Sequence, residues 1–389
     1  MTRPRLAVVA SHPVQYYAPL FRELARRLEL SVFYAHRASA EDQAAAGFGV
    51  AFEWDSDLLS GYAHRFLRNV ARQPRLDAFG GCDTPEIGAR LREGGFDAVM
   101  LFGWRLKSDL QAGLAAKRLG LPILVRGDSQ LATPRSPLRR LAKAIAYPPL
   151  LRLADAALYV GERSRAYWAR YGYPASRTFF SPHSVDAAWF ANRATPQARE
   201  ALRARLGIRT EAAVALFAGK LAPFKRPLDV VEAAARLRRD GAPVTVLVAG
   251  AGELAGAMAD AARRAGVDLH PLGFCNQTQM PEVYAASDVL VLPSDSRETW
   301  GLVANEALAC CRPVVLSDQV GAAPDLAADG DAGRVFRGGD AADLAAALGQ
   351  VLTQPPSSHR IAAKSAAYSL VRAADGVEEA LARVRRPRS

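Results

Sequence analysis

The stretch ASDVLVLPSDSRETWGLVANE, residues 286–306, encodes a buried strand, a loop and the beginning of a helix. Its first half is an apolar run that ends at Pro293, and from Leu302 onward the apolar residues recur at helical spacing. Glu298 is therefore predicted in the loop, and Glu306 inside the helix, roughly 7 Å along its axis. The helix N-terminus predicted between these two carboxylates carries free N–H groups, which attract phosphate.

A second stretch, VALFAGKLAPFKRP at residues 214–227, places cations at the end of another strand. A glycine turn follows the strand, and Lys220, Lys225 and Arg226 precede a helix predicted over residues 228–238. Cations in this position hold a pyrophosphate without a metal ion. Together with carboxylates that would bind sugar and ribose hydroxyls, they favour a nucleoside diphosphate sugar as ligand. Taken separately, the carboxylates also fit surface residues without a joint role, and the cations a solvated basic loop.

Short apolar runs alternate with amphipathic stretches along the whole chain. Strands are predicted at Leu6–Ala10, Leu30–Tyr34, Ala98–Phe102, Ile123–Val125, Ala157–Val160, Val214–Phe217, Val244–Ala249, Val289–Leu292 and Val314–Leu316. This alternation predicts right-handed βαβ units, and hence an α/β fold with one doubly wound parallel sheet in each half. Open parallel sheets bind ligands at the carboxyl ends of their strands, which is where both motifs fall.

Composition limits the classes of protein to which the chain can belong. Half of its 389 residues are hydrophobic, which is enough for two domains that each bury a core. No window of about 18 residues is apolar throughout, which argues against a membrane-spanning helix. The first apolar run, five residues long, is short for a signal peptide and predicts a buried strand. The four cysteines form no CxxC pair, so the chain is expected to be cytoplasmic, without disulfides or structural zinc.

Nearly all of the net charge of +11 lies in the first half of the chain. Residues 1–185 hold 26 Lys and Arg against 16 Asp and Glu, whereas the remaining 204 residues hold 24 against 23. Residues 137–147 form a basic amphipathic segment, which suits peripheral binding to an anionic inner-membrane surface. The alternative is an arginine-rich surface that serves solubility. Nucleic acid is not favoured as a partner, because no recognised binding motif occurs.

The two stretches together resemble the donor-site pattern of glycosyltransferase family 4, which combines Gly-Arg/Lys-Leu-x3-Lys with a downstream Glu-x7-Glu. Further matches at family spacing are LVAGAG at 247–252, LGF at 272–274, YAASD at 284–288 and RPVV at 312–315. The resemblance covers residues 210–350 and implies the GT-B architecture of two facing Rossmann-like domains with a cleft between them. It implies an acceptor-binding domain at residues 1–185 and a donor-binding domain at 186–359, with a C-terminal helix near 360–389 that packs back on the first.

The resemblance also implies roles for individual residues. Lys220 and Lys225 would contact the diphosphate, Glu306 the ribose hydroxyls and Glu298 those of the transferred sugar. The other donor-site candidates lie at strand ends or at the helix start, and they are Gly219, Phe274, Asn276, Gly301, Leu302 and Val303. No metal ion or other cofactor is implied, since the cations and the helix end would neutralise a donor of the UDP or GDP type.

The first domain departs from the family pattern in two loops. Many members have a glycine-rich loop after the first strand, where this chain has SHPVQYY at residues 11–17. Many have a histidine near the reacting carbon, where this chain has RGDS at residues 126–129. Asp128 is a candidate partner of the acceptor hydroxyl or of the anomeric carbon, or else a turn residue. His12 is a candidate catalytic group on the acceptor side, or else a loop residue that caps the next helix.

These features predict a retaining, metal-independent glycosyltransferase that moves a sugar from a nucleoside diphosphate to a glycan or lipid-linked acceptor, in bacterial glycan or glycolipid assembly. Retention follows from the resemblance alone. A nonhydrolysing nucleotide-sugar epimerase would share the fold and would need no acceptor. A non-catalytic partner that binds nucleotide sugars is a third interpretation, which the altered first-domain loops favour and the intact Glu298, Glu306, Lys220 and Lys225 disfavour.

Overall fold

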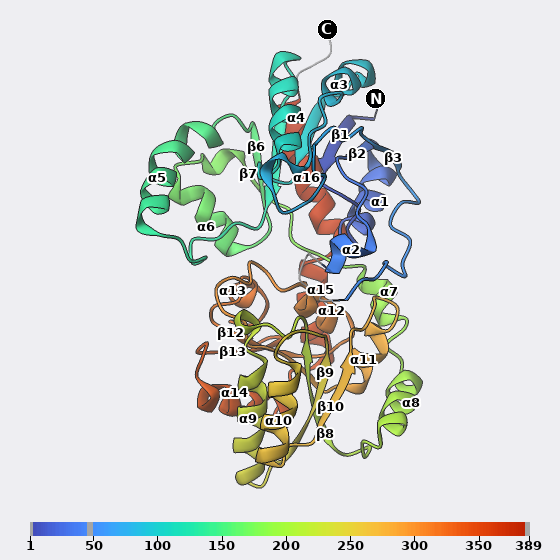
Figure 1. The fold of residues 1–389 in the computed structure, drawn as a ribbon, viewed down its shortest axis with the longest axis vertical. Coiled ribbons are helices and arrows are strands. Elements are labelled where there is room, and N and C mark those ends of the chain that lie inside the picture. The colour runs from blue at the N-terminus through green and yellow to red at the C-terminus, as the bar shows by residue number, and fades with distance from the viewer. Residues whose placement is uncertain (1–2, 45–49, 386–389) are drawn as a thin grey trace.

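Two parallel sheets, one in each half of the chain, form the framework of the computed structural model, which describes residues 3–44 and 50–385 (Figure 1). The first sheet has the order β3 (Ala63–Phe66), β2 (Glu29–Tyr34), β1 (Arg5–Ala10), β4 (Ala98–Leu101), β5 (Ile123–Gly127), β6 (Ala156–Tyr159) and β7 (Thr178–Phe180). The second has the order β10 (Leu269–Gly273), β9 (Val244–Ala249), β8 (Ala213–Ala218), β11 (Val289–Leu292), β12 (Val314–Ser317) and β13 (Gly333–Phe336). The predicted α/β fold with a Rossmann-like parallel sheet in each half is confirmed.

Helices cover both faces of the two sheets, so that each sheet lies between two hydrophobic clusters. Those of the first half are α1 (Ala18–Arg27), α2 (Ala40–Gln43), α3 (Ile87–Gly94), α4 (Lys107–Arg118), α5 (Pro137–Leu151) and α6 (Glu162–Arg170). Those that follow are α7 (Ala187–Ala191), α8 (Pro196–Leu206), α9 (Pro227–Arg239), α10 (Ala255–Ala265), α11 (Met280–Ala286), α12 (Leu302–Ala309), α13 (Ala323–Leu326), α14 (Ala341–Thr353), α15 (Ser358–Ala367) and α16 (Leu370–Val384). In the described ranges, no helix has both the length and the apolar character needed to cross a membrane.

The strands that hydrophobic patterning missed are the four sheet edges, β3, β7, β10 and β13. An edge strand is paired on one side only and carries polar residues, so its sequence lacks a continuous apolar run. His64 and Arg65 occupy the middle of β3, and His270 lies within β10. The central strands were predicted because helices cover both of their faces; all four residues of β11, for example, are buried.

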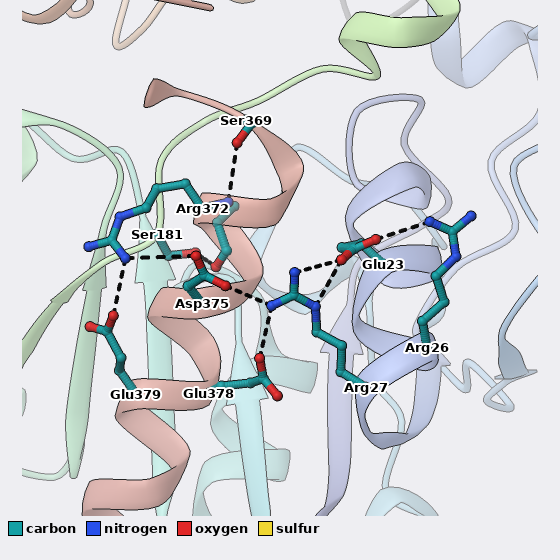
Figure 2. A network of polar contacts seen from close by, with 10 residues as sticks. Glu23, Arg26, Arg27, Ser181, Ser369, Arg372, Asp375, Glu378 and Glu379 are labelled. Atoms are coloured by element: carbon teal, nitrogen blue, oxygen red, sulfur yellow. Dashed lines mark hydrogen bonds and ion pairs between the residues drawn. The ribbon is translucent and has the colours of Figure 1, made fainter. Parts of the chain in front are cut away.

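The last helix, α16, returns to the first half and packs against α1, β6 and β7 (Figure 1). Its buried residues are Ala373, Ala374, Gly376, Val377, Ala380 and Leu381. A Cβ atom at Gly376 would lie 1.9 Å from the carbonyl oxygen of Phe180, so this approach to β7 requires glycine. On the opposite side, the Arg27 guanidinium of α1 donates to Asp375 at 2.7 Å and to Glu378 at 2.9 Å (Figure 2). The two ends of the chain are thereby joined in one unit.

Candidate functional site

A cavity of about 130 Å³ lies at the carboxyl ends of β8 and β9. The second half supplies most of its wall, from the ends of β8, β9 and β10 and from α11 and α12, and the first half supplies Gln15 and Trp54. The turns that follow β8 and β9 approach each other closely, because a Cβ atom at Gly250 would lie 1.8 Å from the carbonyl oxygen of Gly219. The cavity therefore forms at the carboxyl ends of the strands, where open parallel sheets bind their ligands.

Glu306 forms part of the cavity wall from within α12. Its carboxylate accepts a hydrogen bond of 2.7 Å from the hydroxyl of Tyr284 on α11. Burial raises the pKa of Glu306 to about 7, and the bond from Tyr284 offsets only part of this rise. A carboxylate has acceptor sites for several hydrogen bonds, so Glu306 retains capacity for the hydroxyls of a ligand.

The start of α12 is shaped by Gly301, which has a φ of 100°. A Cβ atom at this position would lie 2.5 Å from the Leu292 side chain, so the left-handed turn into α12 requires glycine. Val303, in the first turn of α12, lines the cavity beside Glu306. Gly301 and Leu302 are not among the described residues that line it. Val303 is thus the predicted helix-start residue that lines the cavity, and contact of the helix end with a ligand stays a prediction.

Lys225 and Glu298 form an ion pair, and each of the two side chains is 14% exposed. The hydroxyl of Ser294 lies 3.3 Å from the same carboxylate oxygen of Glu298. A Cβ atom at Gly219 would lie 3.8 Å from the Lys225 Nζ, so the pair lies against the strand-end turn that forms the cavity wall. Two residues 73 positions apart in the sequence are thereby brought together at one side of the cavity.

The cations predicted after β8 separate into two groups. Lys220 lines the cavity, where burial and then the nearby charge of Lys225 lower its pKa. Arg226 points elsewhere, because its guanidinium donates to Asp229 of α9 at 2.7 Å. Lys220 therefore lies in the cavity wall and Lys225 beside it, whereas Arg226 belongs to the start of α9. The contact of the two lysines with a diphosphate stays a prediction.

A segment of the first half, residues 52–56, crosses to the loop after β10. The rings of Phe52 and Phe274 lie 4.3 Å apart between their centroids. The Asn276 side-chain amide donates to the carbonyl oxygen of Glu53 at 2.8 Å. Further hydrogen bonds in this crossing join Asp55 to Thr278 and Ser56 to Gln277. Phe274 lines the cavity beside Trp54, whereas Asn276 holds the crossing segment and is not among the described residues that line the cavity.

Asp128 extends from the end of β5 to the loop that holds Glu298. Its carboxylate accepts a hydrogen bond of 2.6 Å from the hydroxyl of Thr299, and the Nε2 atom of His183 lies 3.8 Å away. Burial raises the pKa of Asp128, but these two partners outweigh it and lower the pKa to about 2. Asp128 is therefore an ionised carboxylate in contact with Thr299, the residue that follows Glu298, and its predicted role toward the acceptor stays a prediction.

His12 lies outside this cluster. Its Nδ1 atom lies 2.9 Å from the hydroxyl of Ser11, and burial, followed by the charge of His36, lowers its pKa to about 4. The imidazole is therefore neutral at pH 7. His12 does not cap α1, because the N-cap residue of that helix is Tyr17. It is also not among the described residues that line the cavity, so its predicted role on the acceptor side stays a prediction.

Residues that the sequence did not single out complete the site. Trp54 and Gln15 line the cavity from the first half, and His183 lies beside Asp128 with its ring 5.6 Å from that of Trp300. The one signal for Trp54 was a pair of aromatic residues in a polar loop. Nothing in the local pattern indicated His183, which lies in the connection between the two halves.

No cluster of three or more metal-ligating side chains (His, Cys, Asp or Glu) occurs in residues 3–44 and 50–385. Asp329 and Asp331, two carboxylates separated by one glycine, lie at the surface, where they form ion pairs with Lys364 and Arg360. Neither of these two carboxylates belongs to the cavity wall.

One protein-family model matches most of the second half of the chain. Residues 198–368 match the family model described as Glycosyl transferases group 1, and this segment contains every donor-site candidate from Gly219 to Glu306. A D-inositol 3-phosphate glycosyltransferase of Geodermatophilus obscurus is 35% identical over 204 residues, which are 50% of this chain and 44% of that protein. The enzyme of the same name from Stackebrandtia nassauensis is 38% identical over 195 residues, 47% of this chain and 42% of that protein. The match thus spans less than half the length of these curated relatives.

Solved structures resemble the whole chain. HepE of Anabaena in complex with UDP has a TM-score of 0.71 at 17% identity, over 97% of this chain and 99% of that one. Sucrose-phosphate synthase of Thermosynechococcus elongatus has a TM-score of 0.71 at 18% identity, over 97% and 98%. At this identity the likeness concerns the fold. The chain has a GT-B fold, and its residues 198–368 match the family model of the glycosyl transferases group 1.

Proposed function

We propose that this protein is a glycosyltransferase that moves a sugar from a nucleoside diphosphate sugar to an acceptor held by its first domain. One observation carries the proposal: Lys220, Phe274 and Glu306 line one cavity, and the Lys225–Glu298 pair lies at its side. These groups supply a cation for the diphosphate, an aromatic ring for the base and a carboxylate for hydroxyls. Neighbours of the same fold, such as HepE, have been solved with UDP and with UDP-glucose, which supports a donor of this class.

The residues suggest how the donor would be held. Lys220 and Lys225 would neutralise the diphosphate, because charge-assisted hydrogen bonds to phosphate are the strongest that side chains make. Lys225 now pairs with Glu298, so a bound diphosphate would share its ammonium group and leave Glu298 free to accept hydroxyls of the transferred sugar. Glu306 would accept the ribose hydroxyls, and Phe274 would frame the base beside Trp54. A leaving diphosphate stabilised in this way needs no metal ion.

The acceptor would approach from the first domain. Asp128 is ionised at neutral pH and lies beside the loop that holds Glu298, so it would accept a hydrogen bond from the attacking hydroxyl or face the positive charge that develops at the anomeric carbon. Retention of configuration is part of the proposal through the family resemblance. A glycan or lipid-linked acceptor, in bacterial glycan or glycolipid assembly, is proposed on the same ground. The similarity to inositol phosphate glycosyltransferases covers half of the chain and does not carry their acceptor to this protein.

Product analysis tests the proposal. The protein is incubated with UDP- and GDP-sugars in excess chelator, with and without a mixture of glycan and lipid-linked acceptors, and the release of nucleoside diphosphate is measured. Release that requires an acceptor, and that Glu298→Gln reduces at least about a hundredfold, is the expected result. Isomerised nucleotide sugar formed without acceptor would instead identify an epimerase. Donor binding without any turnover would identify a non-catalytic partner.

A further inference from the structure

Helix α5 exposes its apolar side to solvent. Leu138, Leu141 and Ile145, spaced along one helix face, are 76%, 60% and 70% exposed. The opposite face is the one that packs on the protein: the Lys143 ammonium donates to the Tyr167 hydroxyl at 3.0 Å, and Tyr147 accepts a hydrogen bond of 3.3 Å from Trp104. A surface helix ordinarily turns its apolar stripe inward, so the orientation of α5 is reversed.

The exposed stripe lies within a short segment rich in exposed apolar side chains, here called the α5 surface, which consists of Leu131, Leu138, Leu141, Ile145, Leu150 and Leu153. These are six of the thirteen large apolar side chains that are exposed in the described residues, and they fall within 23 consecutive positions. Contiguous exposed apolar side chains mark interaction sites, whereas scattered ones carry no such meaning. In Figure 1, α5 stands at the outer edge of the first half, beside α6.

The charge around the α5 surface identifies its partner. Residues 129–154 contain five cations and no Asp or Glu: Arg135, Arg139, Arg140, Lys143 and Arg152. Three of these, Arg139, Arg140 and Arg152, are exposed. A second copy of the chain would bring like charges against these cations, whereas an anionic bilayer surface attracts them and accepts the leucines into its interface.

The α5 surface is also close in sequence to the candidate active site. Gln130, six residues before the N-cap of α5, donates to the backbone carbonyls of Ser296 and Glu298 at 2.9 and 3.1 Å. We propose that the α5 surface docks the protein on an anionic lipid bilayer, with the cleft facing an acceptor at that surface. The presence of an acceptor at the bilayer surface rests on the proposed function, but the docking itself does not.

Vesicle sedimentation without donor or acceptor tests the docking. Wild-type protein should bind vesicles of phosphatidylcholine with phosphatidylglycerol, bind pure phosphatidylcholine far more weakly, and dissociate as salt is raised. Leu138→Ala/Leu141→Ala/Ile145→Ala should weaken binding on the order of tenfold or more, without harm to α5, since alanine favours helix and these side chains are exposed. Leu110→Ala/Leu114→Ala is the matched control on α4, where the two side chains are 46% and 48% exposed, and should bind as wild type does.

A second variant separates charge from apolar contact. Arg139→Gln/Arg140→Gln/Arg152→Gln should lose the preference for anionic vesicles by about tenfold or more. Several results would overturn the docking: no binding at low salt, equal binding to neutral and anionic vesicles, or undiminished binding of the Leu138/Leu141/Ile145 variant. If the protein binds no vesicles but forms a dimer, and the Leu138/Leu141/Ile145 variant does not, the α5 surface would be assigned to a second copy of the chain. Because no turnover is measured, the docking and the proposed reaction can fail independently.

Discussion

Relative to wild type, the Glu306→Gln variant should gain stability as the pH rises. Burial raises the pKa of Glu306 to about 7 from its usual value of 4.5. Since the native state holds this proton more tightly than the unfolded state does, the stability that the group contributes is fully present below pH 4.5 and is lost as the pH rises through 7. Glutamine keeps the shape and can still accept the hydrogen bond from Tyr284, but it never ionises.

The size of the effect follows from the two pKa values. Between pH 5 and pH 8, a shift of this size costs the wild-type protein about 2.5 kcal/mol in its free energy of unfolding. The variant avoids this cost, so the melting temperature of Glu306→Gln, measured relative to wild type, should rise by roughly 5–10 °C across this pH range.

Differential scanning calorimetry at pH 5 and pH 8, on protein without ligand, makes the comparison. The transition of interest is the one that involves the second half of the chain. Glu200→Gln, at an exposed carboxylate on α8, is the matched control and should show no comparable rise. A difference between Glu306→Gln and wild type that stays constant, or shrinks, from pH 5 to pH 8 would refute the assignment of a buried, proton-retaining carboxylate in the cavity wall.

Three further variants test other parts of the structure. Glu298→Gln should lower turnover by about a hundredfold or more, while UDP affinity stays equal or tightens because Lys225 is released to the diphosphate; calorimetric titration and rate assays would separate the two. Trp54→Ala should weaken donor binding by about threefold to tenfold, as expected for a lost aromatic contact, and the exposed Phe79→Ala should leave it unchanged. Arg27→Met should lower the melting temperature by roughly 2–4 °C and make α16 more accessible to protease, since partly exposed ion pairs contribute about 1 kcal/mol in total; an unchanged digestion pattern would count against the anchoring role.

The central strands and the donor half of the candidate site could be predicted because their signals are local. Glycine turns, cations at a strand end and a pair of carboxylates around a helix start all lie within short stretches, and parallel topology brings the strand ends to one edge. Lys220, Val303 and Glu306 accordingly line one cavity. Phe274, which follows the edge strand β10, lines the same cavity. Hydrophobic patterning did not predict β10 because the sequence of this strand contains polar residues.

Contacts between distant segments could not be predicted in this way. Trp54 and Phe52 reach the second half from a loop without periodicity, and His183 meets Asp128 only because the chain connects the two sheets there. The sequence also could not predict which face of α5 packs against the protein, since a helical pattern defines the faces of a helix but not the one that is covered. The sequence predicted a basic amphipathic segment, and in the structure the apolar face of this segment is exposed to solvent.

We propose that the cavity between Lys220, Phe274 and Glu306 binds a nucleoside diphosphate sugar without a metal ion. Isothermal titration of the wild-type protein and of Glu306→Ala with UDP, GDP and their sugars, in excess EDTA, tests this most directly. We expect one site per chain for at least one of these ligands, and an affinity about tenfold or more lower in the variant, because the hydrogen bonds from the ligand to the buried Glu306 carboxyl group are lost. Binding that requires added magnesium or manganese, binding that Glu306→Ala leaves unchanged, or no binding of any UDP or GDP ligand would contradict it.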